Sequence, residues 1–240
     1  MPFSHISCIS IGFAAAILSL GLPRDAPGSP LAEAIIAAML PRQSTEYGCG
    51  YAVAAAMLNL LQTAACLAEM RAGKANMAWS TSPLQSDEDM ARAYGKPPPL
   101  SLADIEILIS GQGIDAAAFR TPRAALGSVI AGAPAPLIFH IGGRFPHFIL
   151  AIDARGHEVL LFDPASGLSV LDETELELAA SGYCLVPGGT VNDVQYRMGL
   201  ELLKAILWRY AQKQESTKAP ISTSRSKSPR CSGMFSIFLS

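Results

Sequence analysis

The sequence carries little charge and lacks the motifs of metal and nucleotide sites. Only 16% of its 240 residues are charged and the net charge is -2, which excludes the strongly basic surface of a protein that binds nucleic acid. It contains no GxxxxGK[ST] phosphate loop, so we expect no nucleotide binding in this chain. Its five cysteines and four histidines show no CxxC, HExxH or HxxxH spacing. We therefore expect no metal and no cofactor.

The hydrophobic half of the sequence indicates how the chain is organised. Half of the residues are hydrophobic, which is enough to bury one core of ordinary domain size. We expect one catalytic domain over residues 35–190, a C-terminal helix over 191–213 and a disordered tail over 214–240. The tail is predicted because residues 215–232 are mostly Ser, Thr, Lys, Arg and Pro, with few apolar side chains.

The N-terminal segment has the outline of a secretory signal. Residues 9–22 form an uncharged apolar run that is followed by a break rich in Pro, Gly and Ser, which predicts a signal peptide or N-terminal anchor over residues 1–34. A membrane-spanning helix needs roughly twenty residues, so a permanent anchor is the second choice. The stretch before the run has no Lys or Arg, which leaves a buried or unstructured extension as the alternative. The expected location is the periplasm or the inner membrane, with the cytoplasm as the alternative.

The middle of the chain predicts helices first and strands second. Residues 51–70 are mostly Ala, Leu and Met without Pro or Gly, which predicts a central, buried helix. Ser86 and Ser101 each precede acidic residues, as expected at the N-cap of a helix over 86–94 and of another over 101–110. We expect a further helix over 121–131 and the C-terminal helix over 196–212.

Short apolar and β-branched runs in the second half predict strands. Turn sequences near Gly142 and Gly156 indicate that the last strands form an antiparallel meander. Helices followed by an antiparallel sheet define the α+β class. The expected strands cover residues 114–119, 136–141, 147–152, 158–162, 168–171 and 183–186.

Cys49 lies between two glycines at the start of the predicted central helix. The positive end of the helix dipole and the unpaired N–H groups of the first turn stabilise a thiolate there. Gly48 and Gly50 leave room for a substrate backbone, and the N–H of Cys49 is free to face a developing oxyanion. For an isolated cysteine, the alternative is a small buried residue at a helix start.

Two further candidates lie at the ends of predicted strands. His147 begins a strand directly after a loop, and Asp163 ends the next strand sixteen residues later. If these strands pair through the turn near Gly156, the two side chains meet, as an imidazole and its orienting carboxylate must. His140 is expected to be a core histidine and His157 to lie at a polar turn.

Gln43 is the fourth candidate, in the loop six residues before Cys49. A side-chain amide at this position could donate, together with the Cys49 N–H, to the oxyanion of a tetrahedral intermediate. The alternative is an exposed loop glutamine.

An ordered set of motifs resembles peptidase family C39, the bacteriocin-processing, double-glycine leader peptidase domain with a papain-like fold. The resemblance covers about residues 42–187 and implies that Cys49 is the nucleophile, His147 the general base and acid, Asp163 its orienting group and Gln43 the oxyanion donor. Gly48 departs from the family, which often has an acidic or polar residue before the cysteine. The motifs are Gln43, Cys49-Gly50 with the Ala-rich helix after it, Pro136 to His140, His147-Phe148, and Asp163-Pro164 with Gly167.

The resemblance implies a cysteine peptidase that hydrolyses a peptide bond through a thioester acyl-enzyme. The cleaved bond would follow a small-residue, Gly-Gly-like pair in a leader or envelope protein. The ABC exporter that is commonly fused to the family has no counterpart in the sequence, so we expect a stand-alone form whose partners are a peptide or protein substrate and a separate exporter. Two alternatives stay open: a non-cleaving peptide-binding or assembly module, and an acyl transferase that uses the same triad.

Overall fold

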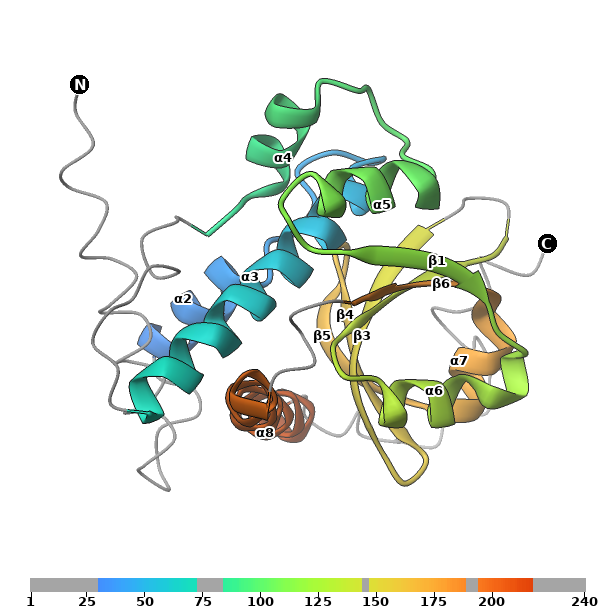
Figure 1. Cartoon of the computed structure of the whole chain (residues 1–240). Helices are drawn as coiled ribbons and strands as arrows, with labels where there is room; N and C mark the ends of the chain where they lie inside the picture. Colours follow the sequence, from blue (N-terminus) through green and yellow to red (C-terminus); the bar gives the residue numbers. More distant parts are fainter. Residues whose placement is uncertain (1–29, 73–83, 144–146, 189–193, 218–240) are drawn as a thin grey trace, which may run out of the picture.

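The computed structural model describes residues 30–72, 84–143, 147–188 and 194–217 (Figure 1). The predicted signal segment lies outside these residues up to residue 29, as does the predicted tail beyond residue 217. The first half of the chain is helical and the second half contains a six-stranded antiparallel sheet. The expected α+β class is confirmed.

Helix α3 (Cys49–Arg71) is the expected central helix, and it begins at the candidate nucleophile. It is the helix of the described part that is long and apolar enough to cross a membrane, yet 89% of its apolar window is buried inside the protein. Small and aliphatic side chains cover it nearly all round, which suits a helix packed on several sides. The core, rather than a bilayer, therefore accounts for its composition.

The two short helices begin at the expected serines. Ser86 precedes α4 (Asp87–Tyr94) and Ser101 precedes α5 (Leu102–Ser110), and each hydroxyl accepts a hydrogen bond from the third residue of its helix. In both helices that residue is an aspartate whose side chain accepts from the N-cap N–H in return. These capping boxes fix where each helix starts.

The sheet has the strand order β1-β6-β2-β3-β4-β5, and every pair is antiparallel. The hairpin between β3 and β4 turns at Gly156, whose φ is 62°, and at His157, which is exposed as expected. The strands are β1 (Ala116–Arg120), β2 (Leu137–Ile141), β3 (His147–Arg155), β4 (Glu158–Asp163), β5 (Gly167–Asp172) and β6 (Ala180–Pro187).

Helices cover both faces of the sheet, and Figure 1 shows α3 and α8 (Val194–Thr217) on one side and α6 (Leu126–Gly132) and α7 (Glu173–Ala179) on the other. On β3, alternate side chains face the two layers, because successive residues of a strand point to opposite faces. Phe148 and Leu150 join the core around α3, whereas Ile149 and Ala151 join the smaller core under α6 and α7. The sheet is therefore held between two helical layers.

Helix α8 is part of the main core. At Gly199 an added Cβ would lie 1.9 Å from the carbonyl oxygen of Ala64 in α3, so the two helix backbones touch there. Further along α8, Trp208 donates a hydrogen bond of 2.8 Å to the buried carboxylate of Asp153 on β3. Lys204 forms an ion pair of 3.4 Å with the same carboxylate. These contacts attach α8 to both α3 and the sheet.

Several boundaries differ from the expectations, for reasons of tertiary contact. Helix α2 (Pro30–Met39) was not predicted, and it crosses the expected domain boundary at residue 34, with Ile35 in the core. Helix α7 was also missed, although Asp172 caps its N-terminus. Strand β6 begins at Ala180 rather than residue 183, because Ala180 pairs with Ile141 of β2. Helix α8 continues to Thr217, so residues 214–217 are helical and not part of a disordered tail.

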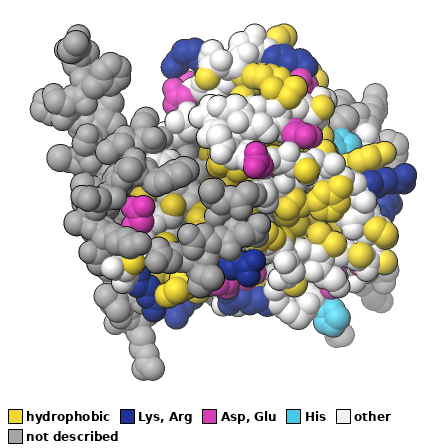
Figure 2. Space-filling view, in the orientation of Figure 1, with side chains coloured by type: hydrophobic (Ala, Val, Ile, Leu, Met, Phe, Trp, Pro, Cys, Tyr) yellow, Lys and Arg dark blue, Asp and Glu magenta, His cyan; other side chains and the backbone are white. Residues whose placement is uncertain are grey.

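The surface over β1 and β6 carries exposed hydrophobic side chains, which gather as a yellow area right of centre in Figure 2. Phe119 is 38% exposed and Tyr183 is 49% exposed. Strand β1 lies at one edge of the sheet and pairs with β6 alone. Its residues from Ala117 to Arg120 are exposed, so this edge is the least covered part of the sheet.

Candidate active site

Cys49 is the first residue of α3 and is only 6% exposed. A short turn leads into it, in which the N–H of Gly48 donates to the carbonyl of Thr45 over 3.1 Å. At Gly48 an added Cβ would lie 2.9 Å from the Thr45 hydroxyl. A side chain at position 48 would require the Thr45 hydroxyl to move, so the turn is tight around Gly48.

His147 and Asp163 meet at one end of the sheet. The strand register pairs Leu150 with Phe162 and Asp163 with Gly167, so β3 begins where β4 ends. His147 Nε2 lies 2.8 Å from Asp163 Oδ1, and the side chains are 19% and 30% exposed. The expected meeting of an imidazole and a carboxylate at paired strand ends is therefore observed.

The carboxylate of Asp163 is held by its own turn as well as by the imidazole. Its Oδ1 accepts from the N–H of Ala165 over 2.7 Å, and its Oδ2 accepts from the hydroxyl of Ser166 over 3.0 Å. Burial alone would raise the pKa of Asp163, but hydrogen bonds and the charge of His147 hold that pKa below its usual value. Asp163 is thus an ionised group in a fixed orientation.

His147 contacts both Asp163 and Cys49. Burial alone would lower its pKa, but hydrogen bonds to Asp163 and Cys49, together with the charge on each, raise the pKa of His147 to about 9. The imidazole therefore carries a proton at neutral pH. Since Nε2 faces Asp163, Nδ1 is the nitrogen left for the sulfur. The imidazole therefore lies between the sulfur at the start of α3 and the carboxylate of Asp163.

Gln43 lies in the loop before Cys49 and is half-buried. Its backbone N–H donates to the carbonyl of Pro164 over 3.2 Å, which attaches the loop to the turn that follows Asp163. Its side-chain Nε2 donates to the carbonyl of Glu46 over 3.3 Å, and its Oε1 has no hydrogen-bond partner among the described residues. The structure thus attaches the Gln43 backbone to the turn after Asp163, whereas its side-chain amide is bonded within the loop.

Two residues of this region were not among the candidates. Arg42 donates to the carbonyl of Ala165 over 2.8 Å, and it packs against Gly167, where an added Cβ would lie 2.6 Å from the guanidinium. Asp87, the first residue of α4, accepts two hydrogen bonds from Ser44. The sequence shows Asp87 only as one acid in a capped helix start, so its contact with the loop required the tertiary structure.

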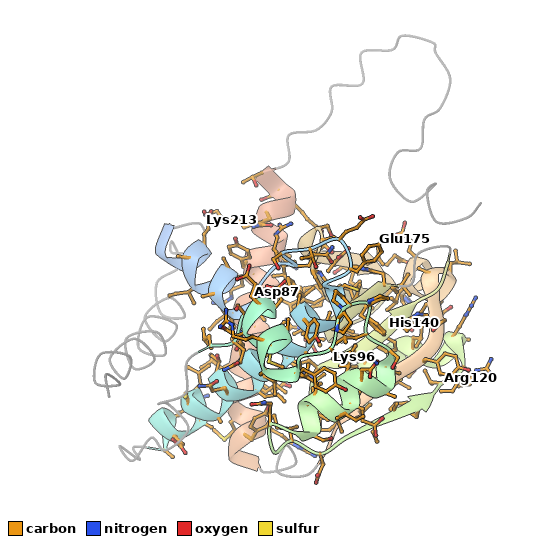
Figure 3. The ribbon with its side chains drawn as sticks, turned by 90° about the horizontal axis from the view of Figure 1, so that it is seen from above. Asp87, Lys96, Arg120, His140, Glu175 and Lys213 are labelled. Carbon is orange, nitrogen blue, oxygen red and sulfur yellow. The ribbon has the colours of Figure 1, made fainter. Side chains whose placement is uncertain are left out.

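The other described histidines and cysteines lie outside the site. His140 Nδ1 is 2.8 Å from the hydroxyl of Ser181, its ring packs on Phe148, and burial lowers its pKa. His140 is thus a half-buried histidine with a hydrogen-bond partner, more exposed than the expected core histidine, and Figure 3 shows it apart from Asp87. Burial raises the pKa of Cys66 and that of Cys184, the latter to about 11, so both stay thiols at neutral pH. Within the described ranges, no cluster of three or more His, Cys, Asp or Glu could hold a metal ion.

The fold and the site together define a class. A buried helix begins with a cysteine, and this end of the helix lies against the histidine and the aspartate of an antiparallel sheet. This is the papain-like arrangement, and the chain is a cysteine-type peptidase. Residues 88–190 match the model of the Peptidase C39 family, which confirms the predicted resemblance. The matched segment contains His147 and Asp163 and begins after Gln43 and Cys49. Among curated proteins, no sequence matches the chain.

Solved structures similar to this chain include three peptidase domains. The peptidase domain of Streptococcus ComA, a bifunctional ABC transporter, is 13% identical with a TM-score of 0.45, over 62% of this chain and 96% of that one. The domain of Streptococcus mutans ComA is 13% identical with a TM-score of 0.43, over 63% and 99%. A double glycine motif protease from an AMS/PCAT transporter, solved with its leader peptide, is 16% identical with a TM-score of 0.38, over 63% and 91%.

Proposed function

We propose that this chain hydrolyses a peptide bond with Cys49 as the nucleophile, His147 as general acid and base, and Asp163 as the group that orients His147. The observation that carries the proposal is the contact of one imidazole with both Cys49 and Asp163. Because the pKa of His147 is raised to about 9, its imidazole is protonated at neutral pH and supplies the proton that the leaving amine needs.

The steps follow from that arrangement. The Cys49 thiolate attacks the carbonyl carbon, so a C–S bond forms and the carbonyl oxygen becomes an oxyanion. His147 then gives its proton to the amine as the C–N bond breaks, which leaves a thioester. Water loses a proton to His147 and attacks the thioester, the C–S bond breaks, and the acid product departs. The protonated imidazole and the thiolate are thereby restored.

The oxyanion would be bound by the backbone N–H of Cys49 and by the side chain of Gln43. In the free enzyme Gln43 Nε2 has a long hydrogen bond of 3.3 Å to Glu46, and the Oε1 atom is unpaired among the described residues. The amide therefore gives up little when it turns toward a substrate. Loss of one such donor typically lowers kcat by about 100-fold or more.

The proposed cleavage point follows a Gly-Gly-like pair in a leader or envelope protein, with a separate exporter as the partner that moves the product. Supporting this are the motifs shared with family C39 and the match of residues 88–190 to the family model. The first test uses a fluorogenic peptide that ends in Gly-Gly-aminomethylcoumarin and a second that ends in Leu-Leu-aminomethylcoumarin. We expect cleavage of the first and little cleavage of the second.

Cys49→Ala decides whether the proposed nucleophile is correct. Since no other group forms the thioester, we expect no detectable cleavage by this variant, with an unchanged circular dichroism spectrum. Cys66→Ala is the matched control, because Cys66 is a buried thiol of the same helix outside the site, and it should keep full activity. Cleavage by Cys49→Ala at the wild-type rate would refute the proposal.

The same assay separates the two alternatives. Binding of the peptide without turnover by the wild-type chain indicates a non-cleaving docking module. Mass spectrometry of the product in the presence of an added amine distinguishes hydrolysis from acyl transfer, because transfer yields an amide in place of the acid.

A further inference from the structure

The loop that carries Gln43 is held from one side by the turn that follows Asp163. The N–H of Gln43 donates to Pro164 over 3.2 Å and the guanidinium of Arg42 donates to Ala165 over 2.8 Å. These bonds connect the loop to the residue that orients His147. They fix the backbone on the N-terminal side of Gln43.

The other side of the loop is held by a single carboxylate. Asp87 is 6% exposed, and its Oδ2 accepts from the backbone N–H of Ser44 over 2.6 Å and from the Ser44 hydroxyl over 2.8 Å. Its Oδ1 accepts from the N–H of Glu88 over 3.0 Å, in the first turn of α4. Figure 3 shows Asp87 at the start of α4, beside the loop that leads into α3. The carboxylate therefore joins the loop to a capped helix.

The same carboxylate adjoins the residue before the nucleophile. A Cβ added at Gly48 would lie 3.5 Å from Asp87 Oδ2, so Asp87 lies near both ends of the segment from Ser44 to Gly48. Among the residues that the structure describes, the Gln43 side chain has only its 3.3 Å bond to Glu46. The backbone, which Asp87 holds, therefore determines which positions the Gln43 amide is able to reach.

We infer that Asp87 is a positioning residue for the peptidase reaction, which acts through Ser44 to place the Gln43 amide toward the oxyanion. The inference rests on the proposed function. It assigns to α4, outside the four candidate residues, a part in stabilising the transition state. Removing the carboxylate should lower kcat and leave substrate binding nearly unchanged, because an oxyanion exists only in the transition state and intermediate.

The test compares peptide cleavage with alkylation of Cys49 by iodoacetamide. Alkylation needs the thiolate and His147 but forms no oxyanion, so a positioning role predicts that the two readouts separate. For Asp87→Ala we expect kcat on the Gly-Gly-aminomethylcoumarin peptide to fall about 10- to 100-fold, KM to change less than about threefold, and the alkylation rate to stay within about twofold. Asp87→Asn, which keeps one acceptor oxygen, should retain more activity.

Glu88→Gln is the matched control, since it removes a negative charge from the next residue of α4, whose side chain is exposed. Its kcat should equal that of the wild type. A double variant, Gln43→Ala with Asp87→Ala, should lose no more kcat than Gln43→Ala alone, because both changes remove the same interaction.

Three results would overturn the inference. The first is an equal fall of alkylation and cleavage in both Asp87 variants, which indicates general loss of structure. The second is a fall in kcat of the double variant that equals the product of the two single falls, which indicates that Asp87 acts independently of Gln43. The third is full activity of Asp87→Ala while Gln43→Ala is impaired, which leaves the proposed function standing and removes Asp87 from it. If Gln43→Ala itself is fully active, the oxyanion assignment and the inference both fail.

Discussion

At the scale of single residues, the site depends on where one proton resides. His147 is largely enclosed, and burial alone would make its imidazole neutral at pH 7. The contacts with Asp163 and Cys49 reverse that effect and raise the pKa of His147 to about 9. The His147 imidazole thus already carries the proton that it must deliver to the leaving amine.

The pH dependence of activity should show this stored proton. We expect kcat/KM on the Gly-Gly-aminomethylcoumarin peptide to fall as the pH rises through about 9, the pKa of His147, because the neutral imidazole has no proton to give. Asp163→Asn removes a cause of the raised pKa, so the midpoint should move to lower pH and kcat should fall at least about tenfold. Titration of the His147 ring protons by NMR provides the direct measurement.

The same proton contributes to stability, with a defined sign. Because the folded-state pKa of His147 lies above its ordinary value of 6.5, the contribution is fully present below pH 6.5 and is lost as the pH rises through about 9. A His147→Ala variant should lack this part of the pH dependence of unfolding. If the NMR midpoint in the wild type lies at the ordinary value, both expectations are wrong.

At the scale of elements, α8 completes the core although it follows the segment that matches the family model. Leu203 and Leu207 are fully buried beside α3, and Trp208 bonds to Asp153 of β3. The close approach at Gly199 makes this contact specific, since the helix backbones meet without an intervening side chain. α8 therefore supports the helix that carries Cys49.

Gly199→Ala should test that packing. The added Cβ would lie 1.9 Å from the carbonyl oxygen of Ala64, so the helices must separate, and overpacking of this kind costs about 1–3 kcal/mol of unfolding free energy. Gly132→Ala in α6 is the control, because nothing lies within 4 Å of its added Cβ, and its change should stay within about 0.5 kcal/mol. Urea denaturation followed by circular dichroism measures both. Equal stability of the two variants would contradict the close contact.

At the scale of the whole molecule, helix α2 limits where an N-terminal signal segment could be removed without damage to the fold. We propose export with removal of the apolar run over residues 9–22. Helix α2 begins at Pro30 and contributes Ile35, Ile36 and Met39 to the core. Cleavage between residues 22 and 30 would leave α2 whole, whereas cleavage after residue 34 would remove its first turn.

Sequencing of the mature N-terminus tests this proposal. From cells that express the full chain, we expect a protein in the periplasmic fraction that begins between residues 23 and 30. A chain that retains Met1 in the cytoplasmic fraction would contradict export. A variant with a charged residue in the apolar run, Ala15→Arg, should stay unprocessed, because the charge disrupts the signal.

The α+β class, the central helix at Cys49 and the meeting of His147 with Asp163 could all be predicted from the amino-acid sequence. Each of these depends on local information: periodicity, N-caps, and a turn at Gly156 that fixes which strand ends are neighbours. Helices α2 and α7 were not predicted from the sequence. Helix α2 is held by burial against the rest of the core, and the sequence signal of α7 is short, since it consists of the cap at Asp172.

The contacts that hold the loop before Cys49 could not be predicted from the sequence. Asp87 is 43 residues from Ser44 in the chain, and no periodicity relates the start of α4 to a loop that precedes α3. The same holds for Gly199 against Ala64 and for the proton on His147, since a close helix contact and a pKa depend on neighbours that folding brings together. Sequence patterns thus identified the four candidate groups, whereas three-dimensional packing determined how His147 and Asp163 are oriented and the proton that His147 carries.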